Sequence, residues 1–224
     1  MNTLSTPAFA HFLDRLFADS DASRAVLEAR VAALPQARRD AFFTDMADYK
    51  TFYSGARDIH LAVSRETARL LYMLARARNA RNVVEFGTSF GLSTLHLAAA
   101  VRDNGGGGKV ITTEFEPSKV QQAGRNFAQA GLAGLIELRA GDALETLACD
   151  LPDSIDLLLL DGAKNLYSRI LALLEPRLRD GAVIVADNAD WSPDYLARVR
   201  EPENGYLSMP FTEDVELSVR ISPG

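Results

Sequence analysis

Cysteine is nearly absent from this sequence, and its scarcity excludes two kinds of site. The single cysteine, Cys149, cannot form an internal disulfide, and one thiol cannot build a zinc site alone. We interpret Cys149 as a small, buried or half-buried side chain. One unpaired cysteine is typical of proteins of the reducing cytoplasm, which is where we expect this protein.

Blocks of basic residues and long apolar runs are also missing. The 24 Lys and Arg residues are outnumbered by 30 Asp and Glu residues, which gives a net charge of −6. An acidic chain without a basic block argues against nucleic acid and an anionic membrane surface as partners. No apolar run approaches the roughly 18 residues that a membrane span needs, and residues 1–17 show no basic leader followed by an apolar core.

The sequence does contain enough apolar material for one structural domain, because 47% of its 224 residues are hydrophobic. An apolar stripe recurs at helical spacing near the start of the chain, at Phe9, Phe12, Leu13, Leu16 and Phe17. Further helices are predicted at 25–34 and at 36–53. We expect residues 1–60 to cover a ligand cleft or to form the contact of a homodimer, and residues 61–224 to bind the ligand.

From Asn82 onward, short apolar runs alternate with helical segments, which predicts an α/β fold with a parallel sheet and right-handed crossovers. The expected parallel strands are 82–87, 109–115, 136–141, 155–161 and 182–188. The expected helices between them are 91–101, 117–130, 142–147 and about 166–178. Two more strands, at 205–211 and 215–221, are separated by three residues, which predicts a closing antiparallel hairpin.

Each predicted parallel strand ends in an acid or an amide. The strand ends read EFGTSFGLS, TEFE, AGDA, DGAK and DN. One acid after a strand is usually a helix cap, but ligands bind beyond the carboxyl ends of parallel strands. Five such residues at one edge of the sheet therefore favour a binding or catalytic site.

The glycine loop after the first strand indicates which ligand fits. Gly87 and Gly91 are four residues apart, with Ser89 between them. The dinucleotide fingerprint requires glycine at the position of Ser89, so the pattern for NAD fails. Glu114, near the end of the second strand, is placed to accept hydrogen bonds from ribose hydroxyls, which favours a nucleoside without a phosphate tail.

In order along the chain, the segments VVEFGTSFGLST, TTEFEP, AGDALETL, LLLLDGAKNLY and VIVADNADW resemble the small-molecule O-methyltransferases that use S-adenosylmethionine and a divalent metal. Catechol and caffeoyl-CoA O-methyltransferases and their bacterial relatives form this family. The similarity runs from about Leu61 to the C-terminus. It implies a Rossmann-like class I methyltransferase fold, with a mostly parallel seven-stranded sheet and extra N-terminal helices.

The resemblance implies that the protein transfers a methyl group from S-adenosyl-L-methionine to a hydroxyl oxygen of a small molecule. The residues that match cofactor-binding positions are Val63, Glu85, Gly87, Thr88, Ser93, Glu114, Asp142, Ala143 and Asp161. Among them, Ser93 matches a serine that holds the methionine carboxylate, and Glu114 matches the ribose-binding acid.

The resemblance also implies a metal site and a general base. Asp161, Asp187 and Asn188 match the metal ligands, and Lys164 matches the base. Two carboxylates and an amide oxygen suit Mg²⁺, and the absence of histidine and cysteine from the set argues against zinc or copper. An ordinary lysine, with a pKa of about 10.4, is a poor base at neutral pH, but a nearby cation and partial burial would lower that pKa.

Several alternatives stay open at this point. Gly162 and Ala163 stand where family members often carry bulkier or more polar residues, so a metal-independent methyltransferase is the second hypothesis. A nucleotide-binding module or a dehydrogenase is the third. His60 is a candidate for facing the substrate, Trp191 for the acceptor wall or the core, and Glu213 for a distal acid that binds the acceptor.

Overall fold

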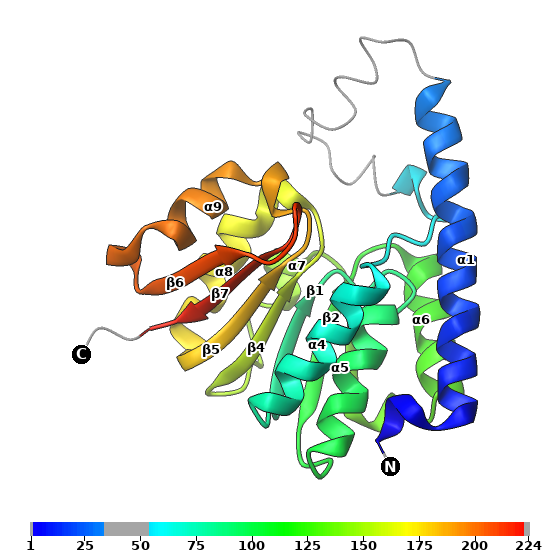
Figure 1. The fold of residues 1–224 in the computed structure, drawn as a ribbon, viewed down its shortest axis with the longest axis horizontal. Helices are drawn as coiled ribbons and strands as arrows, with labels where there is room; N and C mark the ends of the chain where they lie inside the picture. The colour runs from blue at the N-terminus through cyan, green and yellow to red at the C-terminus, as the bar shows by residue number, and fades with distance from the viewer. Residues whose placement is uncertain (1, 34–53, 222–224) are drawn as a thin grey trace.

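The computed structural model describes residues 2–33 and 54–221. Its centre is a seven-stranded sheet with the strand order β3-β2-β1-β4-β5-β7-β6 (Figure 1). All neighbouring strands run parallel except at β7, which is antiparallel to both β5 and β6. The strands are β1 Asn82–Phe86, β2 Lys109–Glu114, β3 Ile136–Ala140, β4 Ile155–Leu160, β5 Leu178–Ala186, β6 Tyr206–Pro210 and β7 Glu216–Arg220. The predicted fold class and the closing hairpin are confirmed.

Helices cover both faces of the sheet (Figure 1). Their bounds are α1 Pro7–Ala32, α4 Arg65–Ala77, α5 Leu92–Asp103, α6 Pro117–Gln129, α7 Ala143–Thr146, α8 Tyr167–Leu174 and α9 Pro193–Arg200. Two sequence predictions were wrong in detail. The N-terminal segment forms one continuous helix, α1, where two were predicted, and the helix expected at 166–178 ends at Leu174, because Pro176 cannot continue it. The helix predicted at 36–53 lies outside the described residues.

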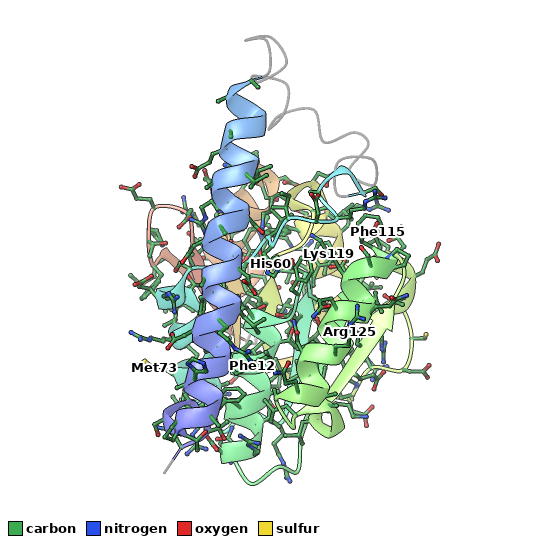
Figure 2. All side chains as sticks on the ribbon, turned by 90° about the vertical axis from the view of Figure 1, so that its right-hand side faces the viewer. Phe12, His60, Met73, Phe115, Lys119 and Arg125 are labelled. Atoms are coloured by element: carbon green, nitrogen blue, oxygen red, sulfur yellow. The ribbon has the colours of Figure 1, made fainter. Side chains whose placement is uncertain are left out.

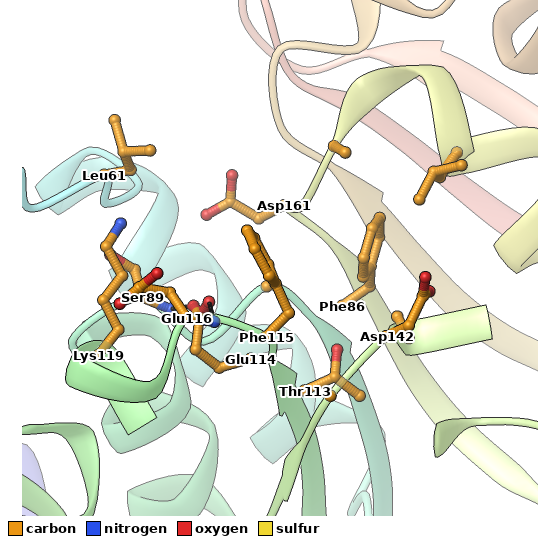
Figure 3. Close-up of a pocket in the computed structure, with 16 residues that line it drawn as sticks. Leu61, Phe86, Ser89, Thr113, Glu114, Phe115, Glu116, Lys119, Asp142 and Asp161 are labelled. Atoms are coloured by element: carbon orange, nitrogen blue, oxygen red, sulfur yellow. Dashed lines mark hydrogen bonds between the residues drawn. The ribbon is translucent and has the colours of Figure 1, made fainter. Parts of the chain in front are cut away.

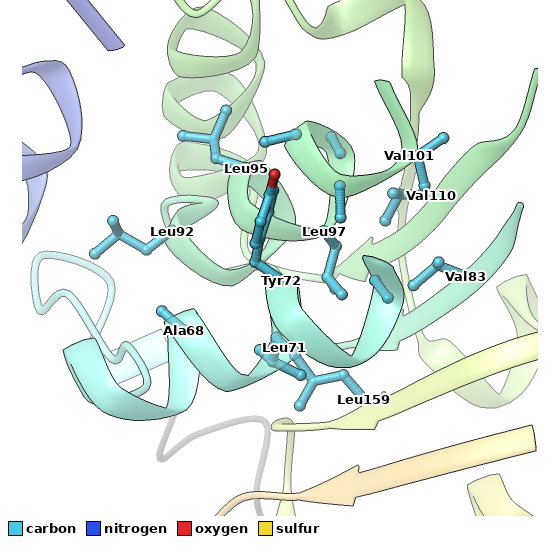
Figure 4. Close-up of a cluster of buried hydrophobic side chains, with 14 of the residues drawn as sticks. Ala68, Leu71, Tyr72, Val83, Leu92, Leu95, Leu97, Val101, Val110 and Leu159 are labelled. Atoms are coloured by element: carbon cyan, nitrogen blue, oxygen red, sulfur yellow. The ribbon is translucent and has the colours of Figure 1, made fainter. Parts of the chain in front are cut away.

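The buried strands explain the two-layer core. In β4, Leu157 and Leu159 face one hydrophobic cluster, whereas Leu158 and Leu160 face the other. All four side chains are fully buried, as expected of a central parallel strand. Figure 4 shows the first cluster, in which Leu71 of α4 and Leu95 of α5 pack over the sheet. The sheet is therefore held on both faces, and its carboxyl edge is a rigid platform.

The apolar stripe of α1 packs inside the chain. Its side chains are only 6–7% exposed and belong to the same cluster as α4 and α5, and α1 lies along the outside of this layer in Figure 2. The ring of Phe17 meets the buried ring of His96 edge-on, with centroids 5.9 Å apart. The stripe was the reason for predicting a homodimer. Because it is used within one chain, it gives no support to that prediction, and dimerisation and the division at residue 60 stay predictions.

Two smaller expectations can also be compared with the structure. Cys149 is exposed, so its interpretation as a buried or half-buried side chain was wrong. Within the described ranges, none of the helices has the length and apolarity that crossing a membrane requires.

Candidate active site

The carboxyl ends of β1 to β4 surround a cavity that is open to solvent (Figure 3). The residues that line it are Leu61, Phe86, Gly87, Ser89, Thr113, Glu114, Phe115, Glu116, Lys119, Gly141, Asp142, Ala143, Asp161, Gly162, Ala163 and Leu166. Of the residues predicted to bind the cofactor, the lining includes Gly87, Glu114, Asp142, Ala143 and Asp161. The side chains come from separate strands and are brought together by the parallel sheet.

Two glycines allow the loop after β1 to pass close to its neighbours. Gly87 has a φ of +105°, and a Cβ atom there would lie 2.5 Å from the backbone oxygen of Asp161. Gly91 has a φ of +89°, and its Cβ would lie 2.3 Å from the ring of Phe127. A side chain at either position would push the loop away from the cavity floor.

Glu85 supports this loop from below and does not line the cavity. Its carboxylate is fully buried, and its Oε2 accepts hydrogen bonds from the hydroxyls of Thr94 and Thr112. Burial raises the pKa of Glu85, and these hydrogen bonds oppose the shift. Thr88 hydrogen-bonds Thr112 at 2.6 Å, so the loop and β2 are tied together.

Val63, Thr88 and Ser93 also lie outside the lining of this larger cavity. Thr88 and Ser93 line a smaller adjoining cavity together with His60 and Phe90. Val63 is 2% exposed and belongs to the core.

Glu114 stands at the end of β2 with both carboxylate oxygens held in place. One oxygen accepts the backbone N–H of Ser89 at 2.9 Å and the other accepts the backbone N–H of Glu116 at 3.0 Å. Burial raises the pKa of Glu114. Because each carboxylate oxygen has a further lone pair, Glu114 can still accept hydrogen bonds from a ligand in the cavity. Asp142 follows β3 and caps α7 by accepting the N–H of Leu144 at 3.0 Å.

At the far end of the cavity, the lining residue Asp161 neighbours a lysine and a second acid, Asp187, that lie behind the lining. Lys164 Nζ donates to Asp161 Oδ1 at 3.1 Å and to Tyr167 Oη at 2.8 Å, and the lysine side chain is only 7% exposed. The Tyr167 hydroxyl lies 2.8 Å from the backbone oxygens of both Leu160 and Asp187, so the two carbonyls share its one proton. This network fixes the position of the ammonium between the ends of β4 and β5.

Asp161 and Asp187 share a hydrogen bond. Burial raises the pKa of Asp161, and the charge of Lys164 opposes the shift. The pKa of Asp187 is raised to about 7, first by burial and next by the negative charge of Asp161. Two neighbouring buried carboxyls cannot both ionise easily without more positive charge nearby.

Asn188 and the β6–β7 hairpin complete this end of the site. Asn188 has a φ of +48°, and its Nδ2 donates to Asp214 Oδ2 at 3.3 Å. The backbone oxygen of Asp214 accepts the N–H of Ala189 at 2.8 Å. The acid that the hairpin brings to this edge is therefore Asp214, whereas the sequence pointed to its neighbour Glu213.

The donor set at this end fits a hard divalent cation. Asp161 and Asp187 supply carboxylate oxygens, and Asn188 keeps its amide oxygen available because Asp214 accepts from its nitrogen. A cation would also offset the charge repulsion that raises the pKa of Asp187. Among the described residues, no group of three or more His, Cys, Asp or Glu side chains could hold a metal by itself. A metal bound by Asp161 and Asp187 would therefore need the Asn188 amide oxygen, water and oxygen atoms of a bound ligand to complete its coordination.

Other residues named from the sequence lie around the cavity or near it. The ring of His60 stacks on Phe90, with centroids 3.8 Å apart and an interplanar angle of 10°, so His60 borders the loop and not the acid pair. Trp191 is 43% exposed, which excludes a core role. Phe115 and Lys119 line the cavity and were not singled out from the sequence. In the sequence, only their position just after the strand β2 could have indicated that they line the site.

Comparisons with known proteins agree with this geometry. Residues 84–189 match the model of a family described as a methyltransferase domain. The chain is 38% identical over 128 residues to a catechol O-methyltransferase of Mycobacterium tuberculosis, which covers 57% of this chain and 57% of that protein. It is 28% identical over 152 residues to a caffeoyl-CoA O-methyltransferase of Mesembryanthemum crystallinum, which covers 66% of this chain and 59% of that protein. The matches therefore span a little more than half the length of these curated relatives.

A solved structure resembles the chain over about four-fifths of its length. The O-methyltransferase TomG from Streptomyces achromogenes, in complex with S-adenosylmethionine, superposes with a TM-score of 0.61 at 26% identity, over 82% of this chain and 96% of that one. The resemblance predicted from the strand ends is confirmed, and the fold is that of the Rossmann-like methyltransferases.

Proposed function

We propose that this chain transfers a methyl group from S-adenosyl-L-methionine to a hydroxyl oxygen of a small molecule, with help from a divalent cation, most suitably Mg²⁺. The observation that carries this proposal is the cavity that joins Glu114 at one end to Asp161 at the other, where Lys164 hydrogen-bonds Asp161 from behind the lining. The names of the curated relatives and the ligand in the TomG structure support the choice of cofactor and acceptor class.

The residues at the nucleoside end bind and orient. Glu114 accepts hydrogen bonds from the ribose hydroxyls through the lone pairs that Ser89 and Glu116 leave open. Ala143, whose N–H lies beside the Asp142 cap, and the ring of Phe115 bound the space for the adenine. Glu85 holds the loop that carries Gly87, so the floor of the cavity is in place before any ligand arrives.

The residues at the acid end position the acceptor and move one proton. When bound, the cofactor supplies an activated methyl group, and a cation held by Asp161, Asp187 and Asn188 supplies Lewis acidity toward the acceptor hydroxyl. Lys164, once neutral, takes the proton of that hydroxyl at Nζ, which Asp161 and Tyr167 hold in one place. Because little else is needed, correct placement of the acceptor oxygen accounts for much of the remaining rate.

One observation favours a second candidate, a methyltransferase that needs no metal. Lys164 already forms an ion pair with Asp161, and Asp161 and Asp187 share a hydrogen bond. These contacts partly offset the charge repulsion between the two acids without any metal cation. In that case Lys164 alone would position and deprotonate the acceptor.

The test is a methyl-transfer assay with a panel of catechol-type and phenylpropanoid acceptors, read by mass spectrometry, with and without EDTA. Calorimetry with S-adenosylmethionine and with NAD runs beside it. The proposal expects binding of S-adenosylmethionine but not of NAD, and methyl transfer that EDTA abolishes and Mg²⁺ restores. Full activity in EDTA would leave the metal-free candidate standing. Binding of NAD alone would overturn both.

A further inference from the structure

Lys119 is a buried cation in the wall of the cavity. It lies in the first turn of α6, and its side chain is 3% exposed. Figure 3 shows it rising beside Ser89 toward Leu61, and its Nζ lies 5.6 Å from the centre of the Phe90 ring. Among the residues that the structure describes, none forms a hydrogen bond or an ion pair with Lys119.

The Lys119 side chain has lost most of its contact with water, and its Nζ has no protein acceptor among the described residues. Burial lowers the pKa of Lys119, which is the expected response of a cation that is largely removed from water. An acceptor on a ligand in the cavity would complete the hydrogen bonding of this ammonium and offset the cost of its burial.

Ser89 places a second unpaired donor beside Lys119. Its Oγ is buried and has no hydrogen-bond partner within the described part of the chain. Ser89 lines both the large cavity and the smaller one that Ser93 borders. Its backbone has a φ of +48°, a conformation that side chains disfavour, and Glu114 holds its N–H.

The simplest alternative is that Lys119 only neutralises neighbouring acids. The acids that act on it through space are Glu114, Glu116, Asp161 and Asp58. None of them comes within 4.0 Å of its Nζ. Both oxygens of Glu114 already accept backbone N–H groups, and the Glu116 carboxylate accepts from Ser118. A counter-ion role would bring at least one carboxylate into contact, which is not what the side chain does.

We propose that Lys119 and Ser89 form an anion-binding subsite for the carboxylate at the amino-acid end of S-adenosylmethionine. This inference rests on the proposed function. Lys119 donates a charge-assisted hydrogen bond, which is the stronger kind, and Ser89 donates a neutral one. The wall of the cavity thereby recognises the amino-acid tail, while Glu114 recognises the nucleoside.

Calorimetry with three ligands separates the tail from the nucleoside. 5′-Methylthioadenosine has the nucleoside and the sulfur but no amino acid, whereas S-adenosylhomocysteine and S-adenosylmethionine carry it. In the wild-type protein, S-adenosylhomocysteine should bind at least about 10-fold more tightly than 5′-methylthioadenosine. Lys119→Met should weaken the two amino-acid ligands by about 10-fold or more and leave 5′-methylthioadenosine unchanged. Ser89→Ala should produce a smaller loss with the same selectivity.

Lys109→Met is the matched control, because Lys109 is 52% exposed and pairs with Glu137 on the surface. It should change none of the three affinities. If Lys119→Met weakens all three ligands equally, the subsite is wrong and the lysine serves the ribose or the shape of the cavity. Equal wild-type affinities for S-adenosylhomocysteine and 5′-methylthioadenosine would also overturn the inference, and this result needs no variant to fold.

These two failures leave the proposed function standing, because the nucleoside still binds. A wild-type protein that binds none of the three ligands would overturn both the subsite and the proposed function.

Discussion

The two ends of the cavity satisfy their buried carboxylates in different ways. At the nucleoside end, Glu85 and Glu114 accept hydrogen bonds from hydroxyls and backbone N–H groups. At the acid end, Asp161 and Asp187 hydrogen-bond each other, and Asp161 forms an ion pair with Lys164. One end uses neutral donors fixed by the fold, and the other uses groups whose charge can change.

This difference fits the division between binding and chemistry that we propose. Backbone donors cannot move or titrate, so the end of the cavity at Glu114 is preorganised, which suits recognition. The acid end contains Asp187, whose pKa is raised to about 7, next to the ion pair of Asp161 and Lys164. Groups of this kind respond to a cation or to a proton, which suits the proposed acceptor site.

The largest expected effect is at the acid end. Lys164→Ala should lower the turnover number by about 10²- to 10⁴-fold, the usual range for loss of a positioned proton acceptor. The affinity for S-adenosylmethionine should change little, because Lys164 does not line the large cavity. Steady-state kinetics and calorimetry on the same preparation measure both quantities.

Lys109→Ala provides the control, since that side chain is on the surface of β2. A second acceptor whose hydroxyl is already ionised at the assay pH should lose less rate in Lys164→Ala. If the turnover number falls by the same factor with both acceptors, Lys164 positions the acceptor and does not take its proton.

The next effect is at the nucleoside end. Glu114→Ala should weaken S-adenosylmethionine binding by roughly 10- to 100-fold, because the ribose loses a charged acceptor. It also leaves the N–H groups of Ser89 and Glu116 without their acceptor. Glu203→Ala, at an exposed position in the loop before β6, is the control. Unchanged affinity in a folded Glu114→Ala protein contradicts the ribose assignment.

The alternation of parallel strands with helices and the edge of the sheet that carries the site followed from the sequence, because both depend on local patterns. Apolar runs without alternation predict buried parallel strands, and acids directly after those runs must gather at one edge. Asp161 and Asp187 could therefore be placed together before any coordinates were known.

Features that depend on side-chain packing between distant segments could not be predicted in this way. Lys119 looked like an ordinary charged residue of an amphipathic helix, and only the structure shows that Phe90 and the lead-in segment at Leu61 enclose it. That Asp214, and not Glu213, contacts Asn188 depends on the conformation of the loop at 211–215 between β6 and β7. The stripe of α1 has the same spacing whether it packs within the chain or against a partner, so the pattern alone could not decide.

A smaller effect concerns the layer that supports the nucleoside end. His96 is buried in α5 beneath α1, and its pKa is lowered to about 4 because burial disfavours the charged ring. The unfolded chain, with a histidine pKa near 6.5, binds a proton between about pH 6.5 and 4 that the folded chain excludes. The free energy of unfolding is therefore at its full value above pH 6.5, and it falls as the pH is lowered through this window.

At pH 5 this histidine should cost the wild-type protein about 2 kcal/mol of unfolding free energy relative to pH 7.5. The variant His96→Leu should lack that component when urea unfolding is compared at the two pH values. His11→Leu is the control, because that side chain is exposed on α1. The same pH dependence in wild type and His96→Leu would show that other groups cause it.

The smallest effect tests whether a cation compensates the acid end, without any assay of activity. Mg²⁺ at ten times its dissociation constant should stabilise the folded protein by about 1.4 kcal/mol, since a ligand that binds only the folded state adds RT ln(1 + [L]/Kd). The gain should appear in urea unfolding at pH 8, where Asp187 is mostly ionised because its pKa is about 7. In Asp187→Asn the repulsion with Asp161 is already removed, so Mg²⁺ should add little stability. The variant should be no less stable than the magnesium-free wild type.

If Mg²⁺ stabilises Asp187→Asn as much as wild type, the ion binds elsewhere on this acidic chain. If it stabilises neither protein, the contrast between the two ends of the cavity rests on Lys164 alone, as the metal-free candidate requires.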